Sequence, residues 1–251
     1  MGGPRLYVGR ELPWGVTLAV CMPANDRMDD LVEKAAELGV ARIVPLMSER
    51  SVLRLQGERA AKKQAHWQGV AVAACEQCGR NRVPVVEPVQ ALGAFLSRPK
   101  DERAGVEVRW QLSLEAHALS LGAAWAGCAA AAPGAGRAGV QGSASHSTLR
   151  EEMRLPPALT VLSGPEGGLS PLEQSLALAA GFTPVSLGPR TLRADTAPLA
   201  ALAAVAVPRA RRRGYRAPSR RHQTAQRVAV SRNGPEADLG THQRATHDSK
   251  A

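Results

Sequence analysis

The pattern of apolar and polar positions in the second half of the chain predicts a strand, a glycine turn and a helix, and then the same three kinds of element again. A short apolar run, Leu159 to Leu162, ends in the glycine-rich turn Ser163 to Ser170, and a helical segment follows from Pro171 to Ala180. A second apolar run, Val185 to Leu187, ends in another glycine turn, and an apolar helix pattern covers residues 197–207. Strands that alternate with helices are typical of a parallel α/β sheet, where ligands bind at the carboxyl ends of the strands. We therefore expect an α/β fold with a site at these two turns.

The first half of the chain carries the same kind of alternation. Apolar residues at helical spacing, each time closed by a glycine, predict two helices here, and short apolar runs predict three strands. The predicted helices cover Met28 to Gly39 and Gly57 to Gly79, and the predicted strands cover Val16 to Val20, Ala41 to Leu46 and Val108 to Leu114. Gly79 is a suitable helix stop, and Pro84 prevents the second helix from continuing.

Composition distinguishes a basic C-terminal segment and an Ala- and Gly-rich internal segment from the rest of the chain. Segment 208–251 holds eleven basic and three acidic residues, so it carries eight of the ten net positive charges and leaves residues 1–207 nearly neutral. It has no apolar periodicity, and we expect a disordered basic tail that either adds salt-dependent affinity for nucleic acid or has no role. Residues 123–147 are rich in Ala and Gly and nearly free of charge, which predicts a flexible insertion. Residues 21–207 would form the folded domain.

Several classes of protein are excluded or disfavoured by simple features. No apolar run approaches the roughly 20 residues that span a bilayer, and residues 1–10 lack the apolar core of a secretory signal. Four cysteines in 251 residues do not suggest a disulfide framework, so we expect a reducing cytoplasm. Cys75 and Cys78 form a Cys-x-x-Cys, but no further ligands stand out, and two small buried helix residues are the favoured interpretation over a metal site.

The two glycine turns suggest ligand binding without naming the ligand. Glycines between a strand and a helix let the backbone approach a ligand closely, and amides at the helix start favour an anion or a polar nucleoside edge. Neither turn matches a Walker loop or the G-x-G-x-x-G dinucleotide fingerprint. In the second turn, Arg193 could bind a phosphate or a substrate carbonyl, or it could form a local ion pair with Asp195 that shapes the loop.

These turns resemble the signature of one known family. The segments LSGPEGGLS at 162–170 and LGPRTLRADTA at 187–197 are similar to the RsmE family of ribosomal RNA (uridine-N3) methyltransferases, in the SPOUT superfamily. Upstream segments agree in the same order: KAAELGV at 34–40 with IVPL at 43–46, SERSV at 48–52 and EQCGRNRVP at 76–84. The resemblance covers about residues 16–207.

The resemblance implies an α/β methyltransferase with a parallel sheet and a C-terminal trefoil knot, acting as a homodimer on N3 of a uridine in small-subunit (16S) ribosomal RNA. It implies S-adenosylmethionine as the cofactor and no metal. Arg193 and Asp195 would be catalytic, with the cation stabilising the uracil anion and the carboxylate orienting it or accepting a proton. Cofactor contacts would come from Leu114, Gly164, Pro165, Glu166, Gly167, Gly168, Leu187, Gly188 and Leu192. RNA contacts would come from Arg50, Arg80, Arg82 and Arg190.

The chain also departs from the family pattern. The family begins with a PUA-like RNA-binding domain, whereas residues 1–20 would be only a remnant of it or a leader. Ala24 and Asn25 stand where a lysine and a glycine are usual, and Asp195 stands in place of a glutamate. Two alternatives therefore stay open beside the expected activity: a truncated, non-catalytic protein that binds RNA or the ribosome, and a SPOUT methyltransferase for another RNA.

Overall fold

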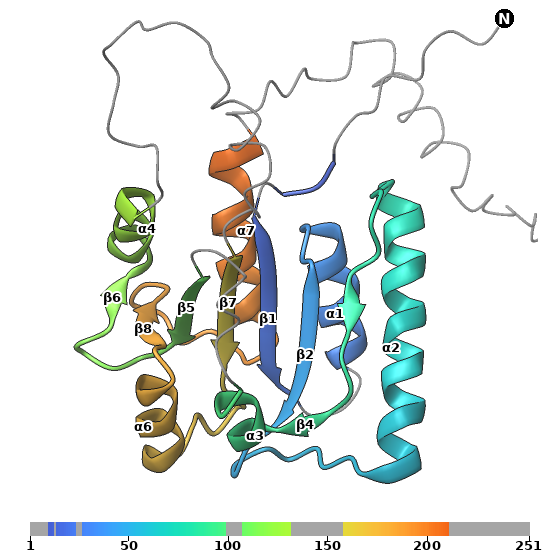
Figure 1. Ribbon diagram of the computed structural model, residues 1–251, viewed down its shortest axis with the longest axis horizontal. Helices are drawn as coiled ribbons and strands as arrows, with labels where there is room; N and C mark the ends of the chain where they lie inside the picture. Colours follow the sequence, from blue (N-terminus) through green and yellow to red (C-terminus); the bar gives the residue numbers. More distant parts are fainter. Residues whose placement is uncertain (1–9, 13, 24–26, 99–106, 132–157, 211–251) are drawn as a thin grey trace, which may run out of the picture. The chain divides into compact units, whose positions relative to one another are not determined.

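A computed structural model describes residues 10–12, 14–23, 27–98, 107–131 and 158–210 (Figure 1). All of them lie in one compact unit, Met1–Arg213. Residues 1–9 of the segment 1–20 expected as a domain remnant or leader, most of the expected insertion and nearly all of the expected basic tail lie outside the described residues. Within the described part, no helix combines the length and apolar character needed to cross a membrane.

The unit is built on one sheet in which every recorded pair of strands is parallel. The strands are β1 Gly15–Cys21, β2 Arg42–Met47, β3 Val85–Val86, β4 Gln90–Ala91, β5 Glu107–Leu112, β6 Leu119–Ser120, β7 Ala158–Ser163 and β8 Thr183–Ser186. Their order is β3-β2-β1-β7-β5-β8-β6, and β4 also pairs with β2. The central strands β1 and β7 are buried on both faces, which explains why they are nearly continuous apolar runs.

Helices cover the two faces of this sheet. They are α1 Arg27–Glu37, α2 Gly57–Cys78, α3 Leu92–Leu96, α4 Leu121–Ala131, α6 Pro171–Ala179 and α7 Thr196–Ala210. One core cluster joins strand residues to α1, α2, α4 and α7, and a second, smaller cluster joins strand residues to α3 and α6. The two clusters alternate along β1, since Leu18 and Val20 belong to the first while Ala19 and Cys21 belong to the second.

The path of the chain brings three loops together at one end of the sheet. After β7 the chain runs through α6 to β8, which lies on the other side of β5, and α7 then returns to contact β7, β1 and α1. The carboxyl ends of β5, β7 and β8 are therefore neighbours, and so are the loops that follow them (Figure 1). The trefoil knot stays a prediction.

The predicted elements are confirmed with small shifts at their ends. Gly79 ends α2 in the left-handed region at φ +70°, as expected for a helix stop. Two expectations are corrected. Residues 123–131, taken as the start of a flexible insertion, belong to helix α4, where Trp125 packs against Trp14 and Trp110. The expected boundary after residue 20 falls inside β1, which pairs with both β2 and β7 and so belongs to the sheet.

Candidate functional site

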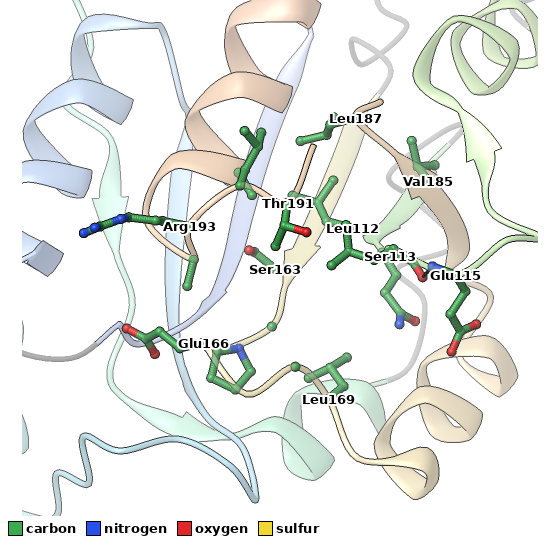
Figure 2. Close-up of a pocket in the computed structure, with 18 of the residues that line it drawn as sticks. Leu112, Ser113, Glu115, Ser163, Glu166, Leu169, Val185, Leu187, Thr191 and Arg193 are labelled. Carbon is green, nitrogen blue, oxygen red and sulfur yellow. Dashed lines mark hydrogen bonds between the residues drawn. The ribbon is translucent and has the colours of Figure 1, made fainter. Parts of the chain in front are cut away.

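A cavity of about 660 Å³ lies at the carboxyl ends of β5, β7 and β8. Figure 2 shows Leu112, Ser163, Val185 and Leu187 around one hollow, with Arg193 and Glu166 on one side of it and Glu115 on the other. Of the residues predicted for the site, the cavity is lined by Leu114, Gly164, Pro165, Glu166, Gly168, Leu187, Arg190, Leu192 and Arg193. Gly167, Gly188 and Asp195 belong to the same loops but are not part of the lining. The loops that the sequence singled out thus meet at one cavity.

The loop after β7 is held tightly at both of its ends. A Cβ at Gly164 would meet the Leu169 side chain at 3.3 Å, so a larger residue there would press against the cavity wall. Gly168 has φ +68°, a conformation that other residues rarely adopt. At the far end, Ser170 and Glu173 form a reciprocal capping box at the start of α6, which satisfies two backbone amides of the first turn.

A second segment, 48–51, supports this loop from outside. Glu173 accepts a hydrogen bond from the Glu49 amide at 2.7 Å, in addition to its bond from the Ser170 amide at 2.9 Å. The Arg50 guanidinium donates to the Gly167 carbonyl at 2.9 Å. Arg50 was predicted as an RNA contact, but the bond that the structure gives it is to the glycine loop. Its side chain therefore helps to hold the cavity wall in place.

Charged groups meet at the rim where α1 begins. The Arg27 Nη1 atom lies 3.6 Å from Glu166 Oε1, and its Nε atom lies 3.9 Å from Asp195 Oδ2. Arg27 thus bridges the loop after β7 and the loop before α7. Asp195 has its recorded ion pair with Arg27 and not with Arg193, so the local Arg193–Asp195 pair left open from the sequence is not what the described residues show. The exposed Arg193 side chain lines the cavity instead.

Two buried polar residues in this site were missed from the sequence. Gln111 in β5 and Ser163 at the end of β7 are only 4% and 2% exposed, and both line the cavity. Gln111 Oε1 has no hydrogen-bond partner among the described residues. Each residue lies inside or at the end of an apolar run, where a lone polar side chain is easily taken for a solvent-facing strand position. The interruption of a buried strand by glutamine was the available signal.

The arginines predicted for RNA binding have different environments. Arg190 is exposed at the cavity, and Arg82 is exposed in the loop after α2. Arg80 was also predicted as an RNA contact, but its side chain is only 5% exposed and its guanidinium has partners within the protein. It pairs with Glu11 at 2.5 Å and donates to the carbonyls of Ala36 and Val40 at 2.8 Å each. Arg80 therefore joins α1, the turn after α2 and the segment before β1, and in this structure it does not face solvent.

Glu11 and Cys21 have shifted pKa values, and neither residue lines the cavity. Burial alone would raise the pKa of Glu11, but the Arg80 guanidinium and the backbone amides of Arg82 and Asn81 bring that pKa below its ordinary value. Burial raises the pKa of the Cys21 thiol to about 12, which keeps it protonated and inert. The Cys75 and Cys78 thiols lie next to the carbonyls of Arg82 and Cys75. Among the described residues no cluster of His, Cys, Asp and Glu has the form of a metal site.

Comparisons with known proteins identify the domain. A family model described as "RNA methyltransferase domain" matches residues 10–118 and 138–206. Curated relatives called ribosomal RNA small subunit methyltransferase E are 31% identical in Bacillus subtilis and 32% identical in Synechocystis, each over 196 residues. These matches cover 78% of this chain, but 67% of the first relative and 54% of the second. The chain thus spans between half and two thirds of the length of these relatives.

Solved structures agree with the sequence comparisons. A small subunit methyltransferase E from Neisseria gonorrhoeae, determined with bound S-adenosylmethionine, is 35% identical with a TM-score of 0.58, and the match covers 79% of this chain and 68% of that one. A Legionella pneumophila protein with the same bound cofactor is 34% identical with a TM-score of 0.61, and the match covers 80% and 69%. Fold, cavity and sequence lead to one conclusion: this chain belongs to the RNA methyltransferase domain family.

Proposed function

We propose that this protein transfers a methyl group from S-adenosylmethionine to N3 of a uridine in small-subunit ribosomal RNA. The observation that carries the proposal is the cavity at the ends of β5, β7 and β8, lined by both glycine loops in a member of the RNA methyltransferase family. The relatives named for small subunit methylation, and the relatives solved with S-adenosylmethionine, support the substrate class and the cofactor.

The cavity suits a nucleoside-type cofactor in size and in chemistry. Its volume of about 660 Å³ lies within the range of roughly 300–1,000 Å³ that small-molecule sites occupy. Its walls combine apolar side chains, among them Leu112, Val185 and Leu187, with a few polar groups. At Gly164 the missing side chain lets backbone form the wall, and a Cβ there would crowd Leu169. Such an apolar cleft with few convergent polar groups is the usual form of a cofactor site.

The protein residues would hold and align the reactants. When bound, S-adenosylmethionine supplies an electrophilic methyl group on a sulfonium, so the drive for transfer comes from the cofactor. Gly164 to Gly168, Leu187 to Leu192 and Leu114 would enclose it. The exposed guanidinium of Arg193 at the cavity would contact a uracil carbonyl and stabilise the negative charge that develops as N3 loses its proton. Alignment of the two reactants is then the main contribution of the protein.

Asp195 has a position that favours orientation over proton transfer. Its carboxylate is outside the cavity lining, and it lies near Arg27 and beside the Thr196 hydroxyl at 3.2 Å. The pair with Arg27 links the loop that carries Arg193 to α1, and the second pair of Arg27 links it to Glu166. We assign Asp195 and Arg27 to the placement of Arg193 at the rim. The proton of N3 would then leave to solvent or to a group on the RNA.

The RNA and a second subunit would meet this rim. Arg190 and Arg82 are exposed cations suited to phosphate contacts, whereas Arg50 would act through the glycine loop. Leu172 and Leu176 on α6 are 67% and 43% exposed and one helical turn apart, which supports a homodimer with α6 at or near its interface. Because the proposed substrate is ribosomal RNA, we place the protein in the cytoplasm.

The test separates cofactor binding from turnover. Wild-type protein should bind S-adenosylmethionine saturably in calorimetry and methylate small ribosomal subunits that lack the modification. Arg193→Ala should lose at least about a hundredfold in turnover, the effect of removing one charge-stabilising donor, while cofactor affinity stays within a few-fold. Arg59→Ala, which removes an exposed arginine on α2, is the matched control and should be fully active.

Each other result has a definite meaning. Full activity of Arg193→Ala would refute its catalytic assignment. Saturable cofactor binding without transfer to any ribosomal particle would instead favour the non-catalytic RNA-binding alternative. Methylation of transfer RNA but not of ribosomal subunits, mapped to its nucleotide, would move the activity to another RNA.

A further inference from the structure

Gln111 is a buried polar side chain for which the fold supplies no visible structural reason. It lies in β5, paired in register with Leu162 of β7 on one side and Pro184 of β8 on the other. The residue is only 4% exposed, and its Oε1 atom has no hydrogen-bond partner among the described residues. The same residue lines the cavity. A buried carboxamide thus borders the proposed cofactor site with its acceptor unsatisfied.

Unsatisfied buried acceptors are uncommon, because each one loses its hydrogen bonds to water and gains nothing in return. Gln68, which is half-buried, shows the usual arrangement. Gln68 donates to the Pro84 carbonyl at 3.0 Å and accepts from the Val86 amide at 2.9 Å, so both ends of its carboxamide are used. Gln111 is more deeply buried than Gln68, lacks such a partner for its oxygen among the described residues and borders a cavity. A bound ligand that donates to it would remove the anomaly.

The position of Gln111 indicates which part of the cofactor it would meet. Five charged residues line the cavity: Glu115, Glu166, Arg190 and Arg193 are exposed, and Arg27 is half-buried, so the charged amino-acid part of the cofactor has partners near solvent. Gln111 is buried, and its registered neighbours Leu162 and Pro184 are apolar. A flat heteroaromatic base can leave water at low cost, whereas an ammonium or carboxylate cannot. The base is therefore the part that fits beside Gln111.

A carboxamide also has the hydrogen-bonding pattern of adenine. It offers one acceptor and one donor side by side, which match the exocyclic amine and N7 of adenine. Rotation about its last bond exchanges the oxygen and the nitrogen, so either atom can face the cavity. Hypoxanthine presents two acceptors at this edge, its carbonyl and N7, so neither orientation of the carboxamide can pair with both.

We propose that Gln111 recognises the adenine base of the cofactor and sets the preference for adenine over hypoxanthine. This inference rests on the proposed function, since it assumes a nucleoside cofactor in the cavity. It adds a residue from β5 to the two glycine loops and assigns it to base recognition, separate from the methyl-transfer residues at the rim.

The experiment compares two stable ligands, S-adenosylhomocysteine and S-inosylhomocysteine, which differ only in the purine: the second has a carbonyl in place of the 6-amine and a proton on N1. Calorimetry on the wild-type protein should give at least about tenfold tighter binding of the adenine ligand, because a site built around a hydrogen bond rejects the analogue that lacks it. Gln111→Leu should weaken the binding of S-adenosylhomocysteine about tenfold, and the affinities for the two ligands should then lie within about twofold of each other. The unfolding temperature of the ligand-free variant should equal or slightly exceed that of the wild type, because the substitution removes an unsatisfied buried polar group.

Gln68→Leu is the matched control, because it removes the same carboxamide from a fully paired site outside the cavity. It should unfold at a lower temperature and keep both the affinity and the adenine preference of the wild type. The proposal is overturned if Gln111→Leu keeps the wild-type ratio between the two ligands, or if it behaves like Gln68→Leu. Failure of the wild-type protein to bind either ligand would overturn the proposed function itself.

Discussion

Replacing Arg80 with alanine removes a side chain that joins three parts of the chain. Arg80 donates to the carbonyls of Ala36 and Val40, at the end of α1 and in the turn that follows it, and it pairs with Glu11 ahead of β1. The Arg80 side chain is 5% exposed and that of Glu11 is 20% exposed. The substitution would leave a nearly buried carboxylate and two carbonyls without their charged donor.

The magnitude follows from these contacts. Breaking one side of a buried ion pair costs about 3–5 kcal/mol, because the remaining charge stays buried without a partner. Glu11 keeps some contact with water and still accepts from the Arg82 and Asn81 amides, so the lower end of that range applies. We expect a loss of about 3 kcal/mol in the free energy of unfolding. For a domain of this size, that lowers Tm by roughly 6–12 °C.

Urea unfolding of the ligand-free protein measures this loss, with Arg82→Ala as the control. Arg82 lies two residues away with an exposed side chain, so its removal should change stability by less than about 0.5 kcal/mol. If the free energy of unfolding of Arg80→Ala lay within about 0.5 kcal/mol of the wild-type value, the structural role would be refuted and Arg80 would return to the candidates for RNA contact. A large loss of RNA affinity without a loss of stability would do the same.

The same pair predicts a dependence of stability on pH. The pKa of Glu11 is lower in the folded protein than its ordinary value of about 4.5. The stability that the Glu11 carboxylate contributes is therefore fully present above pH 4.5 and is lost as the pH falls through the pKa of the folded state. Unfolding free energy should therefore decline below about pH 4.5 in the wild type. Arg80→Ala should show a shallower decline over the same range, which acid titration at fixed urea concentration would detect.

Two further predictions concern the frame of the site. Glu173→Ala removes the capping box and the bond to the Glu49 amide, so it should lower the free energy of unfolding by about 1–2 kcal/mol and weaken cofactor binding a few-fold. Ser175→Ala on the same helix is the control, and equal effects of the two substitutions would contradict the role of Glu173 in joining α6 to segment 48–51. Burial raises the pKa of the Cys21 thiol to about 12, so iodoacetamide at pH 8.5 should leave Cys21 unmodified in the native protein and alkylate it after denaturation. Mass spectrometry measures the labelling, and labelling of the native protein would show that the end of β1 is accessible to solvent.

The elements with strong periodicity were predictable because their pattern depends on local chemistry. The helix ending at Gly79 and the strands of Leu159 and Val185 are marked by apolar spacing and by glycine stops, and the structure has them near the expected residues. Short elements were missed, among them β3, β4 and α3, since two to five residues carry no period. Helix α4 was taken as flexible because its Ala and Gly content hides one aromatic anchor, Trp125.

The sequence by itself determined the chemistry of the two glycine loops. A turn rich in glycine between strand and helix, followed by Arg193 and Asp195, needs no distant residue to indicate ligand binding. Only the tertiary structure decided which side chains join those loops. Gln111 borders the cavity because β5 lies between β7 and β8, and Arg27 reaches the rim because α7 returns beside α1. The Arg80 side chain, predicted to contact RNA, pairs with Glu11, 69 positions away along the chain. Long-range neighbours of this kind depend on strand order and on the path of the chain, which local patterns do not encode.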